Sequence, residues 1–149
     1  MIWKPNVTVA AVIEQDGKYL LVEEDQQDLG VQLNQPAGHL EPGESIIQAS
    51  IREVLEETAY TFIPQWLIGI YHWHSPGTDT TFLRFALSGI VTDFDADRIL
   101  DDGILCAAWF DLNEIRGRKA CHRSPLVMRC IEDYLAGKRY PLEILTHYD

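Results

Sequence analysis

The sequence predicts an α/β protein in which helices cover a mixed sheet, and three observations support this. Runs of apolar and β-branched residues recur at residues 8–13, 19–22, 63–74, 80–91 and 104–110. Two stretches, residues 44–58 and 125–136, instead repeat apolar residues at helical spacing. Strands and helices intermix, and no linker, repeat or low-complexity tract separates them. Residues 1–149 are therefore expected to form one domain.

The first elements are a hairpin and an extended segment. Asp16-Gly17 lies between two apolar runs, which is a strong signal for a tight β-hairpin. Residues 23–30 are polar and are expected to form a loop. Residues 31–37 are expected to be extended, although Pro36 argues against a long central strand.

The first helix is amphipathic. Its apolar stripe consists of Ile47, Ile51, Val54, Leu55 and Thr58. Three acids spaced by three and four residues share the nearly opposite face: Glu53, Glu56 and Glu57. Negative charges at this spacing repel each other unless a cation lies among them, and hard divalent cations take oxygen ligands. The alternative is the solvated face of an ordinary amphipathic helix.

The remaining elements follow from turn signals. Ser75-Pro76-Gly77 separates two long extended runs, and residues 104–110 form a further strand candidate. The second helix has Pro125 in its first turn and Gly137 as its stop signal.

Composition limits the function classes. The chain has 12 Lys+Arg against 23 Asp+Glu, a formal charge of −11. A protein this acidic is poorly suited to binding nucleic-acid polymers or anionic membranes, so small substrates are favoured. No signal-peptide pattern or bilayer-length apolar run is present, and three cysteines without a CxxC pair indicate reduced thiols in the cytoplasm. A monomer or a weak homodimer is expected.

The residues around the acidic triplet strengthen the metal interpretation. Arg52 lies beside the acids and could hold one carboxylate through paired hydrogen bonds. Gly38 begins a loop where the backbone can approach a ligand closely, and Glu44 lies eight residues before Arg52.

The spacing of these residues resembles the signature of the Nudix hydrolases. Seven positions match: Gly38, Glu44, Arg52, Glu53, Val54, Glu56 and Glu57. The family signature continues with a glycine, where this chain has Ala59. That glycine would end the helix in a left-handed conformation, which alanine adopts at a cost of about 1 kcal/mol.

Further blocks extend the resemblance over nearly the whole chain. WKPNVTVAAV, LNQPAGHLE, FLRF, RSPLV and RYPLE are similar to segments of the NudJ-type bacterial phosphatases. The resemblance implies a Nudix-type α/β/α sandwich with a mixed sheet and the signature loop–helix–loop.

It also implies a chemistry. Nudix hydrolases use water and divalent ions to cleave a diphosphate linked to another group. By resemblance, Mg²⁺ (or Mn²⁺) would be held by the Gly38 carbonyl with Glu53, Glu56 and Glu57, while Arg52 would orient a glutamate and Glu44 would be a secondary acid. The general base would be Glu53 or an acid from a distant loop, for which Asp101 and Asp102 are candidates; the alternative for that pair is a turn beside a strand.

The resemblance further implies a substrate class. NudJ-type enzymes release phosphate from nucleoside tri- and diphosphates and act on the hydroxymethylpyrimidine pyrophosphate of thiamine biosynthesis. The alternatives are a nucleotide-pool sanitising pyrophosphohydrolase, an RNA 5′-end pyrophosphohydrolase, which the acidic charge disfavours, and a non-catalytic nucleotide-binding domain, which usually lacks the helix carboxylates.

Four residues are candidates for substrate contacts. Arg84 lies in an apolar strand, where an unpaired charge is costly unless it faces a cleft. Trp73 could stack on a heterocycle, or could belong to the core. Lys4 and Arg123 could hold a terminal phosphate, although such cations are more often surface charges.

Overall fold

A mixed seven-stranded sheet forms the centre of the molecule in the computed structural model, which describes residues 1–149. The strands are β1 (Asn6–Gln15), β2 (Lys18–Asp25), β3 (Val31–Asn34), β4 (Ala37–His39), β5 (Thr61–Ser75), β6 (Thr80–Thr92) and β7 (Ile104–Asp111). The helices are α1 (Ile46–Thr58), α2 (Leu112–Gly117) and α3 (Leu126–Leu135), and short 3₁₀ turns lie at Gln27–Leu29, Lys119–Cys121 and Leu142–Ile144.

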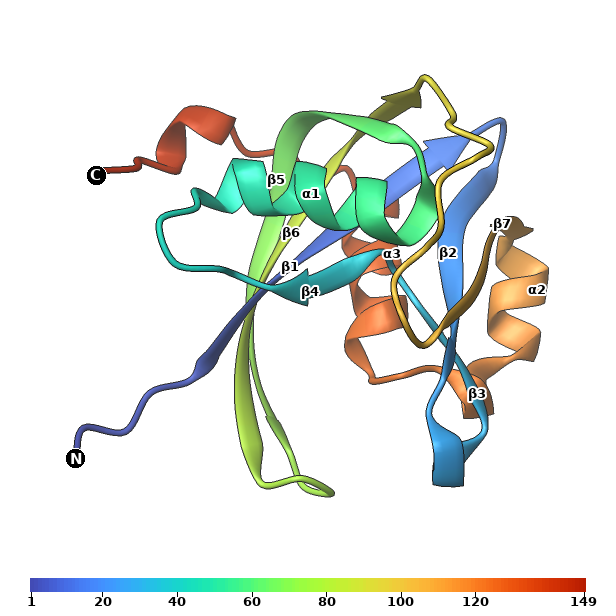
Figure 1. The fold of residues 1–149 in the computed structure, drawn as a ribbon, viewed down its shortest axis with the longest axis horizontal. Coiled ribbons are helices and arrows are strands. Elements are labelled where there is room, and N and C mark those ends of the chain that lie inside the picture. The colour runs from blue at the N-terminus through green and yellow to red at the C-terminus, as the bar shows by residue number, and fades with distance from the viewer.

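The strand order is β3-β2-β1-β6-β5, with β4 added against β1 and β7 against β2 (Figure 1). The β1–β6 pair is parallel, whereas the other pairs are antiparallel. The predicted mixed sheet is therefore confirmed.

The β1–β2 hairpin separates soon after its turn. Asp16 and Gly17 have positive φ values of 53° and 79°, as the Asp-Gly signal predicted. Only two residue pairs next to the turn join the strands, after which β1 pairs with β4 and β6 while β2 pairs with β3 and β7. The chain crosses this opening between β3 and β4, at Gln35 and Pro36. Pro36 lacks an N–H, and its carbonyl oxygen accepts a hydrogen bond from Ala11.

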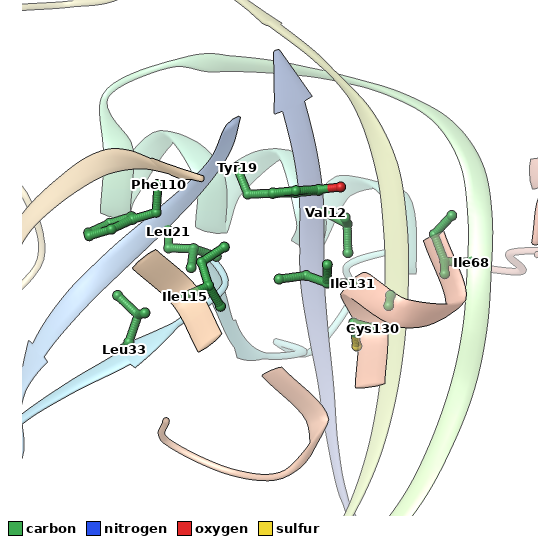
Figure 2. Packing of buried hydrophobic residues seen from close by; sticks show 10 residues of the cluster. Val12, Tyr19, Leu21, Leu33, Ile68, Phe110, Ile115, Cys130 and Ile131 are labelled. Atoms are coloured by element: carbon green, nitrogen blue, oxygen red, sulfur yellow. The ribbon is translucent and has the colours of Figure 1, made fainter. Parts of the chain in front are cut away.

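Helices α1 and α3 lie on opposite faces of the sheet. Ala11 and Ile13 of β1 belong to the same buried cluster as Val54 of α1, whereas Val12 packs with Ile131 of α3 (Figure 2). Successive strand residues point to opposite faces, so the two helices must cover different sides. The result is the α/β/α sandwich that the resemblance implied.

The buried face of α1 differs from the predicted stripe. Val54 and Thr58 are buried as expected, but Ile47, Ile51 and Leu55 are only partly buried. The other buried positions are Ala49, Ser50, Glu53 and Glu57. The reason is that α1 packs against β4 as well as against the main sheet, so part of its glutamate face is turned inward.

Two other local expectations need correction. Residues 23–25 continue β2 rather than belonging to a loop, because all three pair with β3 and the first two also pair with β7. Helix α2 was not predicted, although Asp111 and Glu114 form a capping box at its start. None of the helices is both long enough and apolar enough to span a lipid bilayer.

Candidate active site

The glutamates of α1 face strand β4. The Glu57 carboxylate accepts a hydrogen bond of 2.9 Å from the Ala37 N–H. Next along β4, Gly38 lies so close to Glu53 that a side-chain methyl group would collide with the Glu53 carboxyl. A larger residue at position 38 would therefore have to displace the Glu53 carboxyl, which is a physical reason for glycine at the first position of the motif.

Arg52 ties this helix to the loop that precedes it. Its Nε and Nη2 donate to the two oxygens of Glu44 at 2.6 and 2.9 Å, and Nη2 also donates to the His39 carbonyl at 3.0 Å. Its Nη1 donates to Glu53 at 2.7 Å and lies 3.4 Å from Glu56. The guanidinium thereby fixes the direction of two acids on its own helix.

The loop between β6 and β7 adds a fourth acid. The Asp101 N–H donates to the Glu56 carbonyl at 3.0 Å, and the Asp95 N–H donates to the Ala59 carbonyl at 2.9 Å. These bonds hold the loop against the end of α1 (Figure 1). As a result, carboxylate oxygens of Glu53, Glu56 and Asp101 lie within 4.8 Å of one another.

This arrangement narrows the choice of the loop acid. Asp102 is exposed and does not belong to the group, so Asp101 is the member of the pair that reaches the glutamates. Glu57 lies outside the group as well, with its carboxylate hydrogen-bonded to Ala37. The sequence offered Asp101 and Asp102 alike and could not choose between them, because the proximity of Asp101 to the glutamates depends on how the loop returns to the helix.

Ala59 takes the left-handed conformation expected of the missing signature glycine. Its φ and ψ are 65° and 9°, and its N–H donates to the Leu55 carbonyl. The helix therefore ends where a glycine would end it, and the chain exits in the direction that brings Asp95 to the Ala59 carbonyl.

The pKa values of the acids fit a site for a divalent cation. Burial raises the pKa of Glu53, and burial together with hydrogen bonding and repulsion from Asp101 raises the pKa of Glu56. By contrast, hydrogen bonds from Arg52 hold the pKa of Glu44 below its ordinary value. Several oxygen donors that are costly to ionise together match the preference of hard divalent cations.

Glu57 is the most strongly perturbed of these acids. Burial raises its pKa from the ordinary value of 4.5 to about 9, although the Ala37 N–H acts in the opposite direction. In metal-free protein, folding therefore binds a proton to Glu57 between these two pH values. The stability from this group is complete below pH 4.5 and is lost as the pH rises through about 9.

Two of the four predicted substrate contacts line one cavity. Trp73 and Arg123 border a space of about 760 Å³ between the β5–β6 turn and the start of α3. Trp73 is partly exposed and stacks on Phe82, with ring centroids 6.0 Å apart and an interplanar angle of 18°. Arg123 forms an ion pair of 3.1 Å with Glu24.

The expectation that Arg84 faces a cleft is wrong. The residue is only 6% exposed, and its guanidinium donates to the side-chain oxygens of Asn34 and Gln35 at 3.0 Å each. Hydrogen bonds to these neutral amides satisfy the buried charge in place of an open cleft. Lys4 lies in the exposed N-terminal segment, which runs away from the body of the molecule (Figure 1).

Sequence reasoning missed the polar network around Arg84. Asn34 accepts from Arg84 and donates to Glu24 at 3.1 Å, and Gln35 donates to the Val127 carbonyl at 2.7 Å. These residues come from segments far apart in the chain, and no spacing pattern marks them.

The fold and the acidic site are those of a Nudix protein. The model of the NUDIX domain family matches residues 3–130, so the chain belongs to the Nudix family. It is accordingly an enzyme, a hydrolase of phosphoanhydride bonds.

Individual relatives make the resemblance more specific. The chain is 40% identical to the phosphatase NudJ of Shigella boydii over 99% of its own length and 95% of that protein. It is 38% identical to the phosphatase NudJ of Escherichia coli K12, with the same coverage. A solved NUDIX hydrolase from Nitrosomonas europaea is 67% identical, with a TM-score of 0.96 over 97% of this chain and 98% of that one.

Proposed function

We propose that the protein is a Mg²⁺-dependent phosphohydrolase of small pyrophosphate compounds. Its substrates would be nucleoside tri- and diphosphates, from which it releases phosphate, and the hydroxymethylpyrimidine pyrophosphate of thiamine synthesis. The observation that carries the proposal is the meeting of Glu53, Glu56 and Asp101 beside Gly38. The similarity to the NudJ phosphatases supports the choice of small phosphorylated substrates.

The carboxylates would hold the ion. Glu53, Glu56 and Glu57 are the proposed ligands together with the Gly38 carbonyl, and Mn²⁺ is expected to substitute for Mg²⁺. When bound, such an ion neutralises diphosphate charge, lowers the pKa of water and stabilises the leaving phosphate oxygen. Asp101 contributes a carboxylate oxygen to the same cluster.

The other residues position these groups. Arg52 holds one oxygen of Glu53, which leaves the second oxygen free for a ligand. Glu44 accepts two hydrogen bonds from Arg52 and keeps its guanidinium from rotating away. We assign the general base to Glu53 or Asp101, because both have oxygens within the cluster and Asp102 does not.

A phosphate-release assay tests the proposal. Wild-type protein is given nucleoside tri- and diphosphates and the pyrimidine pyrophosphate, with and without Mg²⁺, and released phosphate is separated from pyrophosphate. Glu56→Gln should lower kcat/KM by at least about 100-fold, because it removes a charged ligand. Glu143→Gln, a change at an exposed glutamate in a 3₁₀ turn, should have no effect.

The opposite outcomes are also informative. A rate in Glu56→Gln within a few-fold of wild type would refute the site. Tight nucleotide binding without turnover at saturating Mg²⁺ would instead indicate a non-catalytic nucleotide-binding domain.

We further propose that the chain forms one Nudix domain and works in the cytoplasm. The segment after the family match supports the first point, because the backbone of Tyr140 exchanges two hydrogen bonds of 2.9 Å with Leu67 of β5. The three cysteines are free, which supports a reducing compartment.

A further inference from the structure

The cavity between the β5–β6 turn and α3 is strongly basic in a strongly acidic protein. Its lining includes four of the 12 Lys and Arg residues of the chain, namely Arg116, Lys119, Arg123 and Arg129. Of the 23 Asp and Glu residues, only Glu132 lines the cavity. A third of all cations therefore gather around one cavity that is nearly free of acids.

Two of these cations lack acidic partners. Arg123 pairs with Glu24 at 3.1 Å and Arg129 pairs with Asp133 at 3.2 Å, but the ion pairs of the protein include neither Arg116 nor Lys119. In a chain of charge −11, acids to pair with are abundant. Both side chains border the cavity and are exposed to it, so their charges are available to an anion.

A series of contacts connects the cavity to the carboxylates of α1. Arg123, on its wall, forms an ion pair of 3.1 Å with Glu24, and Glu24 accepts a hydrogen bond of 3.1 Å from Asn34. Asn34 ends β3, and the N–H of Ala37, which begins β4, donates to the Glu57 carboxylate. The cavity and the α1 carboxylates are therefore connected through the short segment that joins β3 to β4. A volume of about 760 Å³ is within the range of pockets for small molecules.

The lining that comes from β5 includes an aromatic side chain. Trp73 lines the cavity, and its stack on Phe82 holds it in place. Its indole could therefore cover one face of a flat ligand ring. Arg116 and Lys119 are suited to a phosphate, because their side chains carry several N–H donors and a positive charge.

We propose that this cavity binds the end of the substrate remote from the hydrolysed anhydride, and that this end is a heterocyclic nucleoside bearing its own phosphate. Trp73 contacts the ring, and Arg116 and Lys119 bind the remote phosphate. The inference rests on the proposed function, since it takes the α1 carboxylates as the point of hydrolysis. It adds a substrate class, doubly phosphorylated heterocyclic compounds, and two residues that select it.

The test compares two substrates that differ only in the remote phosphate. These are ADP and adenosine 3′-phosphate 5′-diphosphate, each assayed with Mg²⁺ by phosphate release. We expect wild-type kcat/KM to be at least about tenfold higher for the 3′-phosphorylated compound, and we expect the double variant Arg116→Ala/Lys119→Ala to lose this preference. Lys18→Ala, which removes an exposed cation from the β1–β2 hairpin, should retain it.

A binding measurement keeps the two proposals separable. Adenosine 3′,5′-bisphosphate is titrated calorimetrically into metal-free wild type, the double variant and Lys18→Ala. Binding that weakens at least about tenfold only in the double variant supports the cavity assignment even if no compound is hydrolysed, which would refute the proposed function alone. Absence of binding in wild type, equal binding by the double variant, or equal kcat/KM for the two substrates in wild type would overturn the inference.

Discussion

Ala59 allows the energetic consequence of a missing signature glycine to be measured. A non-glycine residue in the left-handed region costs roughly 1–2 kcal/mol. Ala59→Gly relieves that strain but also removes a methyl group that is only 2% exposed, a loss of about 0.8 kcal/mol. It also gives the unfolded chain more freedom, at a cost of roughly 0.5–1 kcal/mol. These opposing effects should nearly cancel.

Ala49→Gly is the matched control. Ala49 lies in the same helix and is fully buried, but it has an ordinary helical conformation with no strain to relieve. Its loss combines about 1 kcal/mol of helix propensity with about 0.8 kcal/mol of methyl burial, roughly 2 kcal/mol in all. For a chain of 149 residues this lowers Tm by about 4–8 °C.

Thermal unfolding in EDTA, followed by circular dichroism, measures both variants without any contribution from bound metal. Ala59→Gly should remain within about 2 °C of wild type, while Ala49→Gly should fall well below it. If Ala59→Gly loses as much stability as Ala49→Gly, the left-handed conformation does not carry the assumed strain and the reasoning is wrong.

Two further predictions concern the carboxylates. Gly38→Ala should displace the Glu53 carboxyl and lower Mg²⁺-dependent phosphate release by about 100-fold, whereas Gly117→Ala, where a methyl group meets open space, should not; an unchanged rate in Gly38→Ala would disprove the close approach. In EDTA, the Tm of wild type should fall as the pH is raised from 6 to 9, because the folded protein holds the Glu57 proton and unfolding must release it. Glu57→Gln should show a shallower decline, and parallel curves for the two proteins would contradict the raised pKa.

The elements that depend on neighbouring residues were predictable. The Asp-Gly turn, the start of the C-terminal helix near Pro125 and the glutamates on one helix follow from backbone preferences that act over a few residues. The left-handed conformation of Ala59 was predictable as well, because the family signature places a helix-ending glycine at this position. The predicted buried face of α1, however, was partly wrong, because the helix also packs against β4, and this is a tertiary contact.

Arg84 shows why contacts between distant segments could not be predicted from the sequence. Its strand was predicted correctly, and a buried charge does need partners. Its partners are Asn34 and Gln35, about 50 residues earlier, and only the crossing between β3 and β4 brings them to it. The sequence indicated that the charge required satisfaction without indicating which groups would supply it.

The same division holds for the site. The sequence by itself determined the acids of α1, the arginine among them and the glycine that faces them, because helical spacing and a close backbone approach are local requirements. Only the tertiary structure decided that Asp101 joins those acids and that Arg116 and Lys119 border the cavity with Trp73. Those residues are brought together by the return of a loop to the end of a helix and by the packing of α3 against the sheet, neither of which leaves a periodic pattern in the chain.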